Sequence, residues 1–126
     1  MLLLLLSEGA LARIIYSKGT GNWTATGTWA GGVVPVSGDT VVIQTPHSVS
    51  VTGNLYSNST YMFLVILGKL DLTNNGKMSF NATSNIIIET GGQLLGNNNA
   101  DQISIGTGSP EYNGSLNSIT GPSYIN

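Results

Sequence analysis

The sequence predicts an all-β fold: a short right-handed parallel β-solenoid of about three to four turns, with a tryptophan-containing cap at its amino-terminal end. The first observation behind this prediction is a repeat within residues 62–106, where short apolar strands alternate with Gly-rich and Asn-rich turns. Equivalent positions of the two passes are 24 and 25 residues apart in the pairs Leu70/Leu94 and Phe80/Ile105. A repeat of this length is typical of one solenoid turn.

The second observation is the composition. Gly, Ser, Thr and Asn contribute 17, 14, 13 and 13 of the 126 residues, and charged residues make up only 8% of the chain, against roughly 25% in ordinary soluble domains. Few side chains are therefore suited to acid–base chemistry. Four basic residues and a net charge of −2 do not make a nucleic-acid-binding surface. The absence of cysteine excludes disulfides and thiolate metal sites.

Residues 1–12, MLLLLLSEGALA, are expected to be a signal peptide or a retained apolar segment, ahead of a single solenoid domain over residues 13–126. The small-x-small ending Ala10-Leu11-Ala12 resembles a cleavage site, although no basic residue precedes the apolar run. The run is too short for a stable membrane span, which needs about 20 residues. If it is retained, the segment is expected to pack as a strand or short helix.

Residues 13–32 open the domain with a predicted strand over Arg13–Tyr16, followed by a Gly-rich turn and the two tryptophans, Trp23 and Trp29. The first turn of a solenoid has an apolar end that needs a cover. Large aromatic side chains are more often core than binding surface. We therefore interpret the two indoles as this cap, with a sugar-stacking platform as the alternative.

The regular turns follow from period-two alternation between Gly, Pro and Asn corners. Asp39 is expected to cap its own turn by bonding to downstream backbone. The Asn-rich corners Thr73–Gly76 and Gly96–Asn99 occupy equivalent places, so their amides are expected to stack from turn to turn. The predicted strands lie at residues 40–43, 48–51, 62–67, 69–72, 77–80, 85–90, 93–95 and 102–105.

After Gly106 the pattern weakens. Ser118–Thr120 is expected to form a final strand, and Ser123–Asn126 is expected to begin another one. An uncharged strand of this kind at the end of a solenoid is an open sheet edge, which favours pairing with another copy.

Four stretches together resemble a known family. Gly21-Asn22-Trp23, Thr28–Gly32, Val34-Pro35 and Gly38–Ile43 are similar to the amino-terminal, G8-like β-solenoid region of secreted Bacteroidetes cell-surface proteins. The closing residues 119–126 also look like an element of that family. The resemblance implies export, often by the type IX route, and residence outside the cell or at its surface. It supplies no catalytic residues, and the expected carboxy-terminal sorting domain is absent, so a fragment or a small assembling subunit is implied.

The carboxylates do not form an obvious catalytic pair. Asp71 is expected to face outward opposite Leu95, and Glu89 is aligned with Val65, so neither has an acidic neighbour in the next turn. A glycosidase needs two carboxyl groups on one face. The acidic residues are scattered along the chain, at Glu8, Asp39, Asp71, Glu89, Asp101 and Glu111.

No cofactor, metal or catalytic residue is expected. His47 is the only histidine and has no Ser or Cys partner at a recognisable spacing. Lys69 and Lys77 flank one corner, and two basic groups do not make an anion site. The sequons at Asn22, Asn58, Asn81 and Asn113 and the O-glycosylation-like Asp39-Thr40-Val41 are compatible with chance in such a composition.

We expect a secreted, non-enzymatic structural protein that self-assembles into an extracellular filament or surface layer. An apolar strand could complete a neighbour's sheet, as in donor-strand assembly, and the carboxy-terminal strand could pair at the open end. Its partners would be other copies of itself. The candidate assembly residues are Leu2, Leu3, Leu4, Leu5, Leu6, Tyr124 and Ile125.

Two other functions stay open. One is an adhesin or carbohydrate-binding module that holds extracellular polysaccharide, and the other, which is disfavoured, is a polysaccharide-cleaving enzyme. The candidate stacking residues of the module are Trp23, Trp29, Tyr56, Tyr61 and Tyr112.

Overall fold

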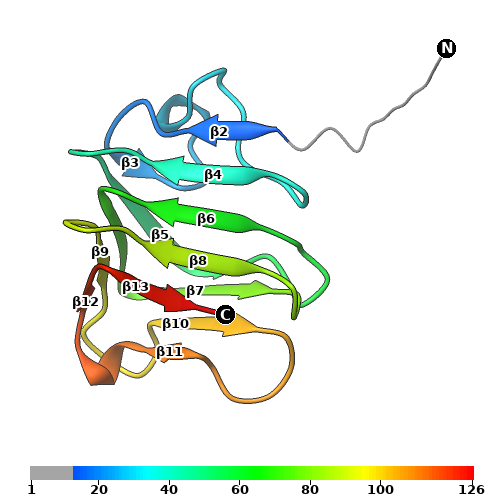
Figure 1. The fold of residues 1–126 in the computed structure, drawn as a ribbon, viewed down its shortest axis with the longest axis vertical. Coiled ribbons are helices and arrows are strands. Elements are labelled where there is room, and N and C mark those ends of the chain that lie inside the picture. The colour runs from blue at the N-terminus through cyan, green and yellow to red at the C-terminus, as the bar shows by residue number, and fades with distance from the viewer. Residues whose placement is uncertain (1–12) are drawn as a thin grey trace, which may run out of the picture.

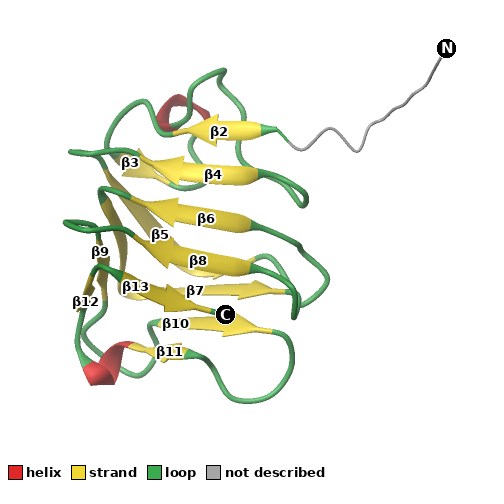
Figure 2. Cartoon of the chain, viewed as in Figure 1, coloured by secondary structure: helices red, strands yellow, loops and turns green. Residues whose placement is uncertain are grey.

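The computed structural model describes residues 13–126, so the predicted leader over residues 1–12, with the candidate assembly residues Leu2 to Leu6, lies outside the described residues. Strands dominate the described chain, and its helical residues form two short 3-10 turns, η1 (Thr26–Thr28) and η2 (Gly114–Leu116) (Figure 2). The strands are β2 (Ile14–Tyr16), β3 (Gly21–Asn22), β4 (Thr40–Ile43), β5 (Ser48–Leu55), β6 (Phe63–Ile66), β7 (Lys69–Phe80), β8 (Asn85–Ile88), β9 (Gln93–Leu95), β10 (Gln102–Ile105), β11 (Tyr112–Asn113), β12 (Ile119–Thr120) and β13 (Ser123–Ile125).

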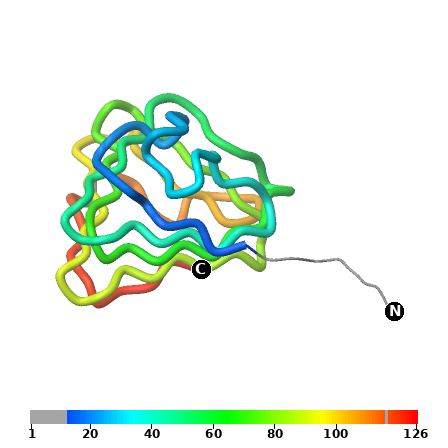
Figure 3. Tube along the Cα trace, turned by 90° about the horizontal axis from the view of Figure 1, so that it is seen from above, coloured from blue at the N-terminus to red at the C-terminus, as the bar shows by residue number. Residues whose placement is uncertain are grey.

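These strands form a β-solenoid of about four turns, as the sequence predicts. A five-stranded sheet in the order β13-β8-β6-β4-β2 makes one wall, and a seven-stranded sheet containing β3, β5, β7, β9 and β10 makes the rest. From β2 to β10 every strand pair is parallel. Figure 1 shows the turns stacked along the long axis, and Figure 3 shows the coil from above.

The predicted repeat is seen directly in the pairing. Leu70 lies opposite Leu94, Phe80 lies opposite Ile105, and Val49 of the preceding turn lies opposite Leu70. The spacing is shorter in the five-stranded sheet, where the partner of Val65 is Ile87. The expected alignment of Glu89 with Val65 is therefore wrong, because the corners differ in length and a single offset does not apply to both walls.

The core consists of rows of apolar side chains stacked from turn to turn. Alternate residues of each strand point inward, and one row contains Ile43, Ile66 and Ile88, all without exposed surface. Burial of this kind stabilises a fold by roughly 25 cal/mol per Å² of apolar surface. The upper end of the core is covered by Trp23 and Trp29, which are completely buried.

One predicted corner is a bend within a strand. Thr73–Gly76 lies inside β7, whose first part pairs with β9 and whose last part pairs with β10. The change of direction falls at Asn75, which has a left-handed φ of 59°, a conformation that Asn tolerates. Gly76 faces Val51 so closely that a Cβ atom would lie 2.4 Å from its carbonyl oxygen. The pairing of β7 with β5 continues past this bend, but its register shifts on both sides of the Thr52–Asn74 pair.

The end of the chain does not continue the solenoid. Strands β11, β12 and β13 run antiparallel to β10, β9 and β8, so the chain turns back over its own last turn. The strand expected at Ser123–Asn126 therefore pairs with the turn already completed, and it is the edge strand of the five-stranded sheet. Gly121 permits the return because a Cβ atom there would lie 2.0 Å from the Glu89 carbonyl oxygen. Ile125 is buried in the core, whereas Tyr124 is exposed.

The stacked rows predict a sharp difference between neighbouring positions of one strand. Leu94→Ala should lower the free energy of unfolding by about 2–5 kcal/mol, because Leu94 is completely buried and its loss leaves a cavity. Leu95→Ala, the matched control on the outward position, should cost less than about 1 kcal/mol. Urea denaturation followed by circular dichroism measures both values, and equal losses would contradict this packing.

Candidate functional site

The two tryptophans form the structural cap and have no surface for a ligand. Their rings meet edge to face at a centroid distance of 4.9 Å. The Trp29 Nε1–H group donates to the Trp23 carbonyl oxygen at 2.7 Å, and the Trp23 Nε1–H group donates to Tyr56 Oη at 2.6 Å. Neither indole can stack on a sugar in this structure, and the cap interpretation agrees with this arrangement.

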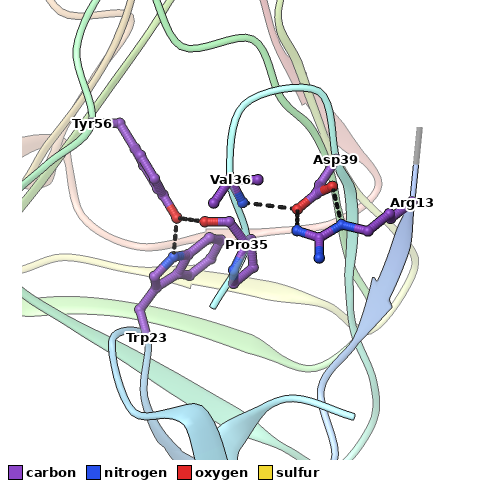
Figure 4. Close-up of polar contacts among 6 residues, drawn as sticks. All are labelled: Arg13, Trp23, Pro35, Val36, Asp39 and Tyr56. Atoms are coloured by element: carbon purple, nitrogen blue, oxygen red, sulfur yellow. Dashed lines mark hydrogen bonds and ion pairs between the residues drawn. The ribbon is translucent and has the colours of Figure 1, made fainter. Parts of the chain in front are cut away.

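Tyr56 connects the cap to the chain that follows it. Its hydroxyl donates to the Pro35 carbonyl oxygen at 2.6 Å while accepting from Trp23 (Figure 4). Tyr112 is also buried, and its hydroxyl donates to the Asn117 carbonyl oxygen. Of the five aromatic residues proposed for sugar stacking, only Tyr61 is exposed, at 38%.

Arg13 and Asp39 form a forked ion pair beside the cap. Arg13 Nε and Nη2 donate to the two carboxylate oxygens of Asp39 at 3.0 and 2.8 Å, and the Val36 N–H group donates to Asp39 Oδ2 (Figure 4). Asp39 thus binds upstream backbone instead of the downstream turn that we expected. The carboxylate raises the pKa of Arg13 by its hydrogen bonds and its charge. The pair fixes the start of β2 to the loop before β4.

His47 does have a serine partner. Its Nδ1 lies 2.7 Å from Ser17 Oγ, which also accepts a hydrogen bond from the Gln44 N–H group. The separation of 30 residues hid this pair from the sequence patterns, so the expectation that His47 lacks such a partner is wrong. Ser17 is completely buried, and a nucleophile has to reach its substrate. The pair therefore holds a corner in place.

Three carboxylates, those of Asp71, Asp101 and Glu111, accept hydrogen bonds from nearby backbone, and Asp101 Oδ1 is buried without a partner. Asp71 accepts from the N–H and hydroxyl groups of Thr73, and it lies opposite Leu95 as expected. Buried Asp101 accepts from two N–H groups of the Asn97–Asn98 turn through Oδ2, and Glu111 accepts from the Ile105 N–H group. Among residues 13–126, no cluster of three or more His, Cys, Asp or Glu side chains could hold a metal ion.

The Asn-rich corners are structural too. Asn98 Nδ2 donates to Asn75 Oδ1 at 3.3 Å, which joins the two corners as the predicted ladder requires. At Asn22, Asn81 and Asn113 the side-chain oxygen accepts from the N–H and hydroxyl groups two residues later. These sequons have a common role as turns that end strands.

The feature with the clearest chemical character is the outer face of the five-stranded sheet. A row of side chains crosses all five strands in register, and each member belongs to an outward position because its neighbours along the strand point into the core. Tyr16 and Tyr124, at the two ends of the row, are 43% and 73% exposed. This apolar row consists of Tyr16, Val42, Val65, Ile87 and Tyr124.

A second outward row lies beside the apolar row and completes the outer face. It is half apolar, since Ile14 is 58% exposed and Phe63 is half-buried. It consists of Ile14, Thr40, Phe63 and Asn85.

The other wall has a different character. Its outward rows are mostly hydroxyl, amide and charged residues, in the register series Ser48–Lys69–Gln93–Thr120 and Lys77–Gln102–Asn113. Because these outward rows are mostly polar, the apolar character of the outer face is specific to the five-stranded sheet. The sequence patterns missed this face: its members are 22 to 37 residues apart along the chain in the pairs Val65/Ile87 and Ile87/Tyr124.

The geometry around Tyr56 predicts how stability changes at alkaline pH. Burial raises the pKa of Tyr56 above its ordinary 10.0, against an opposing effect of the Trp23 hydrogen bond. The folded state therefore holds the phenol proton more tightly, and this stabilisation is complete below pH 10.0 and is lost as the pH rises through the raised pKa.

Tyr56→Phe should make the decline of unfolding free energy above pH 10.0 less steep, and it should cost about 1–3 kcal/mol at neutral pH through its lost hydrogen bonds. Denaturant titrations between neutral and alkaline pH measure both effects. The exposed Tyr61→Phe variant, as the control, should follow the unchanged protein. An unchanged slope in Tyr56→Phe would contradict the prediction.

Comparison with known proteins gives one match. The G8 domain family model matches residues 28–119, whereas the searches of curated proteins and of solved structures found no match. In the described part of the chain, no helix is long and apolar enough to cross a membrane. The family match covers the coil from the second tryptophan to β12, together with the outer face's central strands. The chain therefore belongs to the G8 domain family.

Proposed function

We propose that this G8 domain is a non-enzymatic binding module of an extracellular protein, and that it holds its partner against the outer face of the five-stranded sheet. The family match and the solenoid fold suggest a non-enzymatic domain of the extracellular type. Secretion by a Bacteroidetes cell through the type IX route is the more specific proposal that the sequence resemblance implies.

The observation that carries the proposal is the outer face itself. A solvent-facing row that is apolar on every one of its five strands keeps hydrophobic surface in water, which is unfavourable unless a partner covers it. The outward rows of the other wall are mostly polar, although the same alternation of residues builds them. The apolar outer surface is therefore confined to the five-stranded sheet and is suited to binding a partner.

The arrangement of acidic residues supports a role without catalysis. Asp39 is held by Arg13, Asp71 by Thr73, and Asp101 by the Asn97–Asn98 turn. Each of these carboxylates stabilises local backbone or an ion pair. A glycoside-cleaving site requires two carboxyl groups facing a common groove, and the described contacts assign these three to separate turns.

Self-assembly into a filament is the second candidate, and the geometry supports it less. Ile125, one of its proposed residues, is buried against β8, so it is not available to another copy. The end of the coil is covered by strands of two or three residues, and such short edges protect a sheet from pairing. Tyr124 is exposed, but its side chain belongs to the outer face.

Placing a charge at the centre of the outer face tests the proposed function. Val65→Glu should weaken adsorption to extracellular material about tenfold or more, because docking would bury an unpaired carboxylate. Ser104→Glu places the same charge on the polar wall, where Ser104 faces outward beside Ser79, and should have no effect. Adsorption of labelled protein to intact cells and to isolated matrix measures this, with circular dichroism as the folding check. Equal adsorption of both variants would overturn the proposal.

The short strands at the end of the coil predict the behaviour of the protein in solution. It should stay monomeric as its concentration rises, since its terminal edge strands have only two or three residues each. Multi-angle light scattering and electron microscopy provide the measurement. Filaments or growing oligomers would restore assembly as the leading function.

A further inference from the structure

We infer that the partner held by the outer face is a neutral polysaccharide, whose chain lies across the five strands along the apolar row with a sugar ring stacked on Tyr16 at one end and on Tyr124 at the other. This inference rests on the proposed function and specifies the class of ligand. It differs from the sugar-stacking platform that the sequence left open as an alternative to the cap, because Trp23 and Trp29 are buried.

The shape of the face matches an extended ligand. The two tyrosines occupy the first and last strands of the sheet, β2 and β13, in one register row. Neighbouring strands lie about 4.8 Å apart, so the row is roughly 19 Å long. Between its ends stand the half-buried branched side chains of Val42, Val65 and Ile87. The row thus has an exposed ring at each end and short aliphatic side chains between them. This arrangement forms a shallow binding surface for several linked sugar rings.

The size of the face disfavours a protein partner or a second copy. Strand spacing and a rise of about 3.3 Å per residue give the five short strands a footprint on the order of 300 Å². A stable protein–protein interface needs about 800 Å² on each partner. A narrow polymer can be held on this footprint because it gains from repeated contacts along its length.

The polarity of the face favours a neutral polymer. None of its nine residues is charged, and the chain carries a net charge of −2. Thr40 and Asn85 add a hydroxyl and an amide to the second row, and both groups can exchange hydrogen bonds with sugar hydroxyls. Asn85 Nδ2 donates to the Thr83 carbonyl oxygen, which fixes its amide beside the row. These nine residues offer no counter-charge to an acidic polysaccharide.

The test measures binding of the protein to microcrystalline cellulose, to chitin and to a length series of their soluble oligosaccharides, with polygalacturonate as the acidic comparison. We expect binding to at least one neutral polymer, with affinity that rises with chain length until a ligand reaches both tyrosines. Tyr16→Ala and Tyr124→Ala should each weaken binding about tenfold. Tyr124→Phe should retain it, because stacking needs the ring rather than the hydroxyl.

Two controls separate folding from recognition. Leu95→Ala removes an apolar outward side chain from the polar wall and should bind like the unchanged protein. The melting temperatures of the tyrosine variants should stay close to that of the unchanged protein, because both side chains are exposed.

The outcomes distinguish this inference from the proposed function. If no neutral polysaccharide binds while Val65→Glu still abolishes adsorption to cells or matrix, the ligand class is wrong and the binding module stands. Preferred binding of polygalacturonate, or neutral-polymer binding that both tyrosine variants retain, also overturns the inference. If Val65→Glu does not reduce adsorption, both the proposed function and this inference are overturned.

Discussion

The parallel backbone ladder between successive turns is the interaction on which the rest of this structure depends. Each turn is a few short strands that cannot bury an apolar face alone, so its stability comes from the turns above and below it. In-register stacking places Leu70 on Leu94 and Ile66 on Ile88. The same register that builds these inner rows necessarily builds outer rows, because side chains alternate along a strand.

A stack of this kind needs a cover at both ends, and the chain uses a different one at each. At the first turn, Trp23 and Trp29 bury two indoles, and Tyr56 ties them to Pro35. At the last turn, residues beyond β10 reverse and pair antiparallel with the strands just completed. Antiparallel return satisfies the hydrogen bonds of the final parallel edge. It also brings Tyr124 into the outer row that Tyr16 begins.

The surface chemistry follows from the corners and the walls together. Asn and Asp side chains close the turns through their own backbone, as Asp71 does for Thr73 and Asn81 for Thr83. These polar groups therefore stabilise the turns. The outward residues of the two walls determine the polarity of the surface. One wall presents mostly amides, hydroxyls and lysines, and the other presents the apolar row with a tyrosine at each end. The binding role that we propose is consequently assigned to a wall rather than to a pocket.

The sequence by itself determined the class of fold, the interval of the repeat and the burial of most strands, because these depend on local alternation and on turn residues that act within a few positions. It also indicated that the tryptophans form a cap, since large indoles before the first regular turn favour burial. Only the tertiary structure decided which residues meet across turns. The Ser17–His47 and Arg13–Asp39 pairs join residues 30 and 26 positions apart, and the row from Tyr16 to Tyr124 depends on the register of five strands. The reversal after β10 was equally hidden, because alternation in a two- or three-residue strand is the same whether that strand pairs parallel or antiparallel.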